Sequence, residues 1–241
     1  LILDQPRPTD FTTYEVAPRV SPIINSDKAR FLFFSIGIMV ILFTIVISLV
    51  GNYLNKAIQA FLNDNAFNQH FREQSSRGAT PYLVLYTLFF IYIGFFTLLL
   101  LNDYQVHLPG NSYYLQWALL SAVIALLFLA KQLLLILVRL IFPVASEIRQ
   151  YTFLIITSAI VAATILLPAN LLLAYGPEGS ETWVRWATIA TLLLIYLLHL
   201  VRSLFIANKP LLLHTFHFLL YICTVEIAPV AIMLRLILDK L

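Results

Sequence analysis

The sequence predicts an all-α protein, a polytopic membrane bundle of about six transmembrane helices with an amphipathic helix after the first. Of the 241 residues, 61% are hydrophobic and 11% are charged, whereas soluble chains carry roughly 25% charged residues. The mean hydropathy is +0.88, and several apolar runs reach the length of about 20 residues that crosses a hydrocarbon core. These observations exclude an ordinary soluble domain. The net charge of +3 says little about partners, because the basic residues follow the topology instead of forming a patch, and we expect no nucleic-acid partner.

The first 28 residues differ in composition from the remainder. They contain Pro6, Pro8, Pro18 and Pro22 and show no helical periodicity, which predicts an extended, water-exposed tail. Such sequence buries too little apolar surface to offset the entropy of ordering. We therefore divide the chain into a tail at 1–28, which we expect to contact another protein, and a transmembrane domain at 29–241.

The first span and the segment after it differ in pattern. Residues 31–50 form an uninterrupted apolar run of twenty residues, long enough to cross a membrane. Over residues 53–73, apolar side chains such as Leu54, Ile58 and Phe61 recur at helical spacing among polar ones. This pattern predicts an amphipathic helix that either continues the first span or lies along the membrane surface.

Five further apolar stretches complete the predicted bundle. Pro81 suits the start of the second span, and tyrosines and tryptophans in the loops at 102–114 and 175–186 suit a membrane interface. We expect spans at 81–101, 115–138, 151–173 and 186–201, and a sixth that begins near Leu211 and contains the apolar run 218–234.

The basic residues predict the orientation, because they concentrate on the cytoplasmic side of membrane proteins. The second and fourth loops hold only Arg185. The first, third and fifth loops with their flanks hold Lys56, Arg72, Arg77, Lys131, Arg139, Arg149, Arg202 and Lys209. We therefore expect the odd loops to face the cytoplasm and both termini to face outward, although Lys28, Arg30, Arg235 and Lys240 flank the outward ends.

The last apolar run, residues 218–234, carries the main candidate site. Glu226 stands at its centre and Pro229 follows three residues later. A charged carboxylate at the middle of a membrane helix costs about 3 kcal/mol, and Pro229 frees the carbonyl of Val225 because it has no N–H. Lys131, a basic residue inside the third span, is the natural partner of Glu226. The pair could fix the register of the helices or carry protons.

Two weaker candidate sites remain. Pro168 and Asn170 interrupt the fourth span, where a proline either kinks the helix or helps to line a substrate site. His199, His214 and His217 cluster at the inward ends of the fifth and sixth spans, where histidines could ligate haem or a metal. No acid or cysteine has a matching spacing, so we expect neither a cofactor nor a metal.

The sequence holds no recognised catalytic pattern. It lacks G-x-S-x-G, H-E-x-x-H and a phosphate-binding loop. Its single cysteine, Cys223, permits no intrachain disulfide and no cysteine-based metal site. We expect no catalytic residues and therefore no enzyme.

Two stretches, FLNDNAFNQHFREQ and FHFLLYICTVEIAPV, carry a family resemblance. From the first span onward, the chain resembles a multi-helix inner-membrane family of Bacteroidota that is catalogued as a domain of unknown function, family 4271. The matching residues are Asn63, Phe67, Asn68, Arg72 and Glu73 in the first stretch and Tyr221, Cys223, Glu226 and Pro229 in the second. The resemblance implies a bacterial inner-membrane location, which would place both outward-facing termini in the periplasm, and a role in the cell envelope. It supplies no activity.

From these observations we expect a non-catalytic assembly or accessory subunit of an envelope complex, linked to secretion or gliding machinery. Its partners would be the lipid bilayer and other envelope proteins, reached through residues 1–28. The alternative is a small carrier or proton-coupled channel that uses Glu226 and Lys131, although residues 31–130 and 131–234 show no convincing repeat. A lipid-handling enzyme would need a polar cluster at one interface, for which the three histidines are the only candidates.

Overall fold

The computed structural model describes residues 26–77, 80–104, 112–141, 145–177 and 179–207. These ranges form six helices and no strand: α1 (Ser26–Leu62), α2 (Asp64–Arg77), α3 (Thr80–Asp103), α4 (Tyr113–Ile141), α5 (Ala145–Tyr175) and α6 (Glu181–Ala207). Within them, all but α2 are long and apolar enough to cross a membrane. The prediction of an all-α, multi-pass membrane bundle is confirmed, and the predicted sixth span lies outside the described residues, as does the tail up to residue 25.

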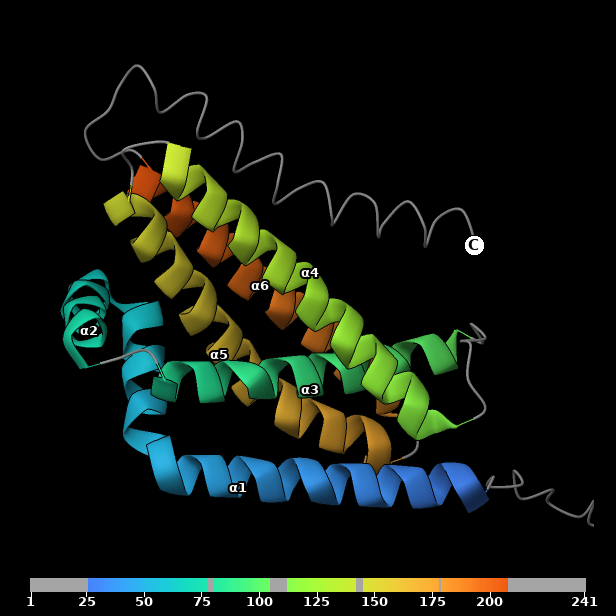
Figure 1. Ribbon diagram of the computed structural model, residues 1–241. Helices are drawn as coiled ribbons and strands as arrows, with labels where there is room; N and C mark the ends of the chain where they lie inside the picture. The colour runs from blue at the N-terminus through green and yellow to red at the C-terminus, as the bar shows by residue number, and fades with distance from the viewer. Residues whose placement is uncertain (1–25, 78–79, 105–111, 142–144, 178, 208–241) are drawn as a thin grey trace, which may run out of the picture.

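The amphipathic stretch after the first span folds as two pieces instead of one. At Val50 the backbone leaves helical geometry, with φ −133° and ψ 22°, and α1 turns sharply (Figure 1). A second break follows at Asn63, whose Oδ1 accepts a hydrogen bond of 2.9 Å from the backbone N–H of Asn65. This is helix N-capping, and it starts α2 in a new direction.

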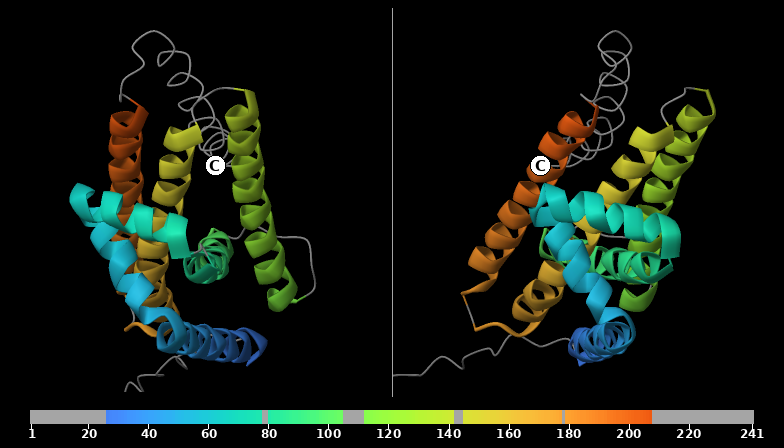
Figure 2. Two further views of the ribbon diagram at one scale, coloured as in Figure 1. Left: turned by 60° about the vertical axis from the view of Figure 1, so that its left-hand side comes forward. Right: turned by 90° about the vertical axis from the view of Figure 1, so that its left-hand side faces the viewer.

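The helices pack around α5. It contacts α1, α3 and α6, while α4 packs mainly against α3. The first part of α1 and α3 run side by side, and α4 and α6 cross them obliquely (Figures 1 and 2). Most of the apolar side chains of α4 are exposed, which suits a helix that faces lipid.

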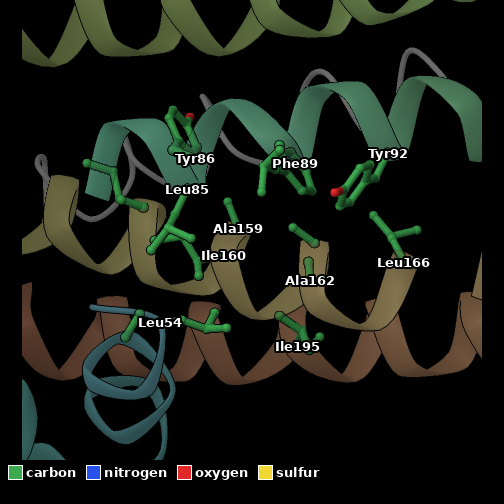
Figure 3. Close-up of a cluster of buried hydrophobic side chains, with 14 of the residues drawn as sticks. Leu54, Leu85, Tyr86, Phe89, Tyr92, Ala159, Ile160, Ala162, Leu166 and Ile195 are labelled. Atoms are coloured by element: carbon green, nitrogen blue, oxygen red, sulfur yellow. The ribbon is translucent and has the colours of Figure 1, made fainter. Parts of the chain in front are cut away.

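Small residues allow the central helices to approach closely, as in other membrane bundles. Leu85 and Phe89 of α3 face Ala159 and Ala162 of α5 in the core (Figure 3). Between α3 and α4 the contact is closer still. A Cβ atom added to Gly94 would overlap Ser121 Oγ and lie 2.9 Å from Ser121 Cα. Only glycine fits this position without moving α3 or α4.

Candidate functional site

Two of the predicted site residues, Lys131 and His199, meet through a third residue, Tyr151. Lys131 Nζ of α4 lies 5.4 Å from the centroid of the Tyr151 ring on α5. The ring of His199 on α6 lies 5.7 Å from the same Tyr151 ring, centroid to centroid. Tyr151 and His199 are buried. Three helices therefore bring an ammonium group, a phenol and an imidazole together.

A hydroxyl group extends this cluster and indicates the tautomer of the histidine. Ser158 Oγ donates a hydrogen bond of 2.9 Å to the carbonyl of Ile155, and it lies 3.3 Å from His199 Nδ1. A hydroxyl group has one hydrogen, and the shorter bond uses it. His199 Nδ1–H is therefore the donor to Ser158 Oγ. We call Lys131, Tyr151, Ser158 and His199 the intramembrane cluster.

The remaining residues of the main candidate site lie outside the described residues. These are Glu226 and Pro229, together with His214 and His217 of the histidine group. The pairing of Glu226 with Lys131 therefore stays a prediction. Within the described ranges, no group of three or more His, Cys, Asp or Glu residues is placed to hold a metal ion.

Pro168 and Asn170 lie at a junction of three helices. α5 continues through Pro168 to Tyr175, and it changes direction in the half that contains the proline (Figure 1). Asn170 is fully buried and donates from Nδ2 to the carbonyl of Tyr92 at 3.0 Å. The hydroxyl of Tyr92 donates in turn to the carbonyl of Met39 at 3.1 Å. This predicted site joins α5 to α3 and α3 to α1.

The end of the bundle that carries α2 has charged contacts that the sequence interpretation missed. We call it the α2 end; it comprises residues 51–77, the start of α5 and the end of α6. Lys56 Nζ lies 2.6 Å from Glu73 Oε2, and His70 Nδ1 lies 3.5 Å from the same oxygen. The hydrogen bond from Lys56 is the largest of the effects that lower the pKa of Glu73 below its ordinary value.

Aromatic packing complements this ion pair. The rings of Phe67 and Phe71 lie 5.2 and 5.9 Å from that of Phe153 on α5, and Tyr82 of α3 meets the Phe153 ring at 5.5 Å. α2 is therefore attached to the bundle through both apolar and charged contacts.

A second ion pair joins α6 to the start of α2. Arg202 Nη2 lies 2.9 Å from Asp64 Oδ1, and Nη1 donates to the carbonyl of Ala60 at 2.8 Å. The guanidinium carbon lies 5.8 Å from the centroid of the Phe61 ring. Arg202 also lines a groove of about 240 Å³ between α2, α5 and α6.

The opposite end of the described helices also carries an interhelical ion pair. Arg185 Nη1 of α6 lies 2.6 Å from Asp103 Oδ2 of α3, beside a smaller cavity of about 160 Å³ that Lys28 and Glu181 also line. In the sequence, Lys56, Arg185 and Arg202 served only to predict orientation. Acidic residues at the same ends of the spans were the signal that could have identified these pairs.

Comparison with known proteins gives a family match. The family model described as a domain of unknown function (DUF4271) matches residues 32–237. No curated protein matches the chain, and no solved structure matches it.

Proposed function

The chain belongs to the family described as a domain of unknown function (DUF4271), and we propose that it is a non-catalytic assembly or accessory subunit. The complex it serves would lie in the inner membrane of a Bacteroidota cell and belong to its secretion or gliding machinery. The observation that carries this proposal is α2, a polar helix held in a fixed position beside the membrane-spanning helices.

The composition of α2 explains why its attachment matters. Only Ala66, Phe67 and Phe71 among its fourteen residues are apolar. A polar helix of this length is marginal in water by itself, so its contacts with the bundle stabilise it. Asp64, Asn65, Asn68, Gln69 and Arg72 remain exposed. A surface ordered before binding loses less entropy when a partner docks, which favours a role for α2 in assembly.

Crosslinking from α2 tests the proposal. A photoreactive residue at Gln69 or at Arg72, both exposed, should yield in cells an adduct of one mass shared by both positions. The control position is Leu133 on α4, which is 65% exposed and should contact lipid. The subunit role predicts that the crosslinked partner co-purifies with this protein at a fixed ratio. It also predicts that Arg72→Glu abolishes the adduct. Equal adducts from all three positions, or none from α2, would contradict the proposal.

The orientation of the subunit follows from charge. The α2 end and the adjoining helix termini carry Lys56, Arg72, Arg77, Arg139, Arg149 and Arg202. Lys28, Arg30 and Arg185 lie at the other end of the described helices. Since basic residues favour the cytoplasm, α2 would face the cytoplasm and both termini the periplasm. A cysteine at position 76, with Cys223 replaced, should stay unlabelled by an impermeant reagent outside intact spheroplasts; labelling there would reverse the orientation.

A second candidate function rests on the intramembrane cluster. Lys131, Tyr151, Ser158 and His199 include groups able to exchange protons, and buried ionisable groups in membrane spans commonly serve transport. With Glu226, they would form the site of a small proton-coupled carrier. Proton flux into liposomes distinguishes this function from the subunit role: a carrier loses flux in Glu226→Gln and in His199→Phe, whereas a subunit shows no flux even in the wild type.

A further inference from the structure

We propose that the groove beside Arg202 binds the phosphate group of an anionic phospholipid from the leaflet at the α2 end. Residues of α2, α5 and α6 line the groove, and α2 crosses in front of the other two helices in the left-hand view of Figure 2. Its volume is about 240 Å³, and its lining includes Arg202, Asn68, Gln150, Phe67, Leu154 and Phe205. This inference stands apart from the subunit role, because it rests on a different set of contacts.

Arg202 supplies the charge that a phosphate requires. Its side chain is 19% exposed, and its contact with the Phe61 ring limits where the guanidinium can lie. A guanidinium group has five N–H donors, and the contacts of Arg202 with Ala60 and Asp64 employ one Nη1 and one Nη2 donor. The planar fork of donors matches phosphate oxygens, and the side-chain amides of Asn68 and Gln150 in the lining can donate as well.

The apolar part of the lining favours a lipid over a free phosphate ion. Phe67 and Leu154 are buried, while Phe205 is 69% exposed at the end of α6. An inorganic anion makes no use of the exposed Phe205 ring, whereas the glycerol and acyl carbons of a lipid would cover it. Aromatic side chains at the ends of spans are typical of the lipid interface.

The level of the groove in the bundle agrees with a headgroup. The span in α5 begins at Ser146, and the span in α6 ends at Ser203. Gln150 and Arg202 therefore lie within a few residues of the water-facing ends of two neighbouring spans. The phosphate of a lipid bound at Arg202 would lie at the membrane boundary, and the acyl chains of that lipid would extend along the helices.

Asp64 is the group that a lipid phosphate would displace. Its side chain is 85% exposed, although its Oδ1 lies 2.9 Å from Arg202 Nη2. Exposed ion pairs contribute little free energy, so the carboxylate can move into water when a phosphate arrives. Asp64 thus competes with the ligand for Arg202 and should weaken binding.

The test is lipid binding to the purified full chain in detergent, followed by native mass spectrometry during titration with phosphatidylglycerol. Arg202→Gln should weaken binding about tenfold, since a bond to a charged group is lost. Arg202→Lys should bind the lipid with an affinity between those of the wild type and Arg202→Gln, because lysine keeps the positive charge but lacks the planar set of donors. Asp64→Asn should bind more tightly than the wild type. The matched control is Arg185→Gln, which breaks the interhelical pair with Asp103 and should leave binding unchanged.

Several outcomes would overturn the proposal. If Arg202→Gln binds like the wild type, the groove is not the lipid site. If Asp64→Asn weakens binding as much as Arg202→Gln, the ion pair only maintains the structure. Inorganic phosphate that displaces phosphatidylglycerol at equal concentration would assign the site to a free anion, and equal affinity for phosphatidylcholine would remove the requirement for an anionic lipid. The Asp64→Asn arm keeps the test informative where Arg202→Gln fails to fold.

Discussion

Lys56 and Glu73 lie seventeen positions apart in the sequence, yet Lys56 Nζ and Glu73 Oε2 are 2.6 Å apart. The ion pair joins the second part of α1 to α2. His70, which is buried, approaches the same carboxylate, and Phe67 on the same helix packs against Phe153. The position of α2 therefore depends on the charge of Glu73 as well as on aromatic packing.

The Lys56–Glu73 pair should make stability depend on pH in the acidic range. Folding lowers the pKa of Glu73 below its ordinary value of 4.5. The ion pair therefore contributes its full stabilisation of the folded protein at pH values above the pKa of Glu73 in the unfolded chain. That stabilisation is lost as the pH falls through the folded pKa. Thermal unfolding in detergent should show a steeper fall in Tm below about pH 4.5 for the wild type than for Glu73→Gln. Parallel Tm curves would mean that the ion pair does not stabilise the fold.

Gly94 should tolerate no larger side chain. Gly94→Ala places a methyl group against the backbone of Ser121, and overpacking of this kind costs about 1–3 kcal/mol. The control is Gly37→Ala, since nothing lies within 4 Å of a Cβ atom there and alanine is the better helix former. We expect a clear loss of thermal stability for Gly94→Ala and none for Gly37→Ala. Equal Tm values would show that α3 and α4 separate readily.

Asn170 and Tyr92 should contribute separately to stability. Asn170→Ala removes the bond to the Tyr92 carbonyl, and Tyr92→Phe removes the bond to the Met39 carbonyl. Interhelical hydrogen bonds in membranes contribute roughly 0.6–2 kcal/mol. Because the Tyr92 carbonyl remains in Tyr92→Phe, each substitution removes a different bond, and the double variant should be less stable than either single variant. A double variant no less stable than either single one would refute two independent bonds.

The predicted pairing of Lys131 with Glu226 can be tested by a double-mutant cycle. Glu226→Gln should retain much of the packing, because glutamine keeps the shape and hydrogen-bonding capacity. Glu226→Leu should cost more, since it leaves the half-buried Lys131 without its predicted carboxylate. Lys131→Leu added to Glu226→Leu should then recover part of that loss, as removing both partners is milder than removing one. Additive losses of thermal stability in detergent would exclude the pairing.

The helix boundaries show which parts of the helices hydropathy predicted and which it omitted. The predicted run 31–50 ends where α1 bends at Val50, although α1 itself begins at Ser26 and continues to Leu62. By contrast, α5 begins at Ala145, six residues before the predicted span at Tyr151. Hydropathy omits the turn around Glu147 and Arg149 because it is polar. Helical hydrogen bonds continue through such a turn, since its side chains can reach water at the membrane boundary.

The sequence pattern predicted neither the break at Asn63 nor the cluster around Tyr151. Apolar periodicity passes through residues 53–73 without interruption, whereas the capping bond of Asn63 ends one helix and starts the next. Tyr151 looked like an ordinary first residue of a span. Its ring contacts with Lys131 and His199 depend on three helices whose relative rotation no single helix specifies.

The sequence by itself determined the class of this protein and the course of its spans, because the lipid environment imposes length and polarity on each helix separately. Tertiary structure alone decided which charges meet. Arg202 reaches Asp64 across 138 positions of chain, and Asn170 reaches Tyr92 across 78. Such contacts depend on how helices are rotated and offset against each other, and that is settled by close packing at residues such as Gly94 and Ala162.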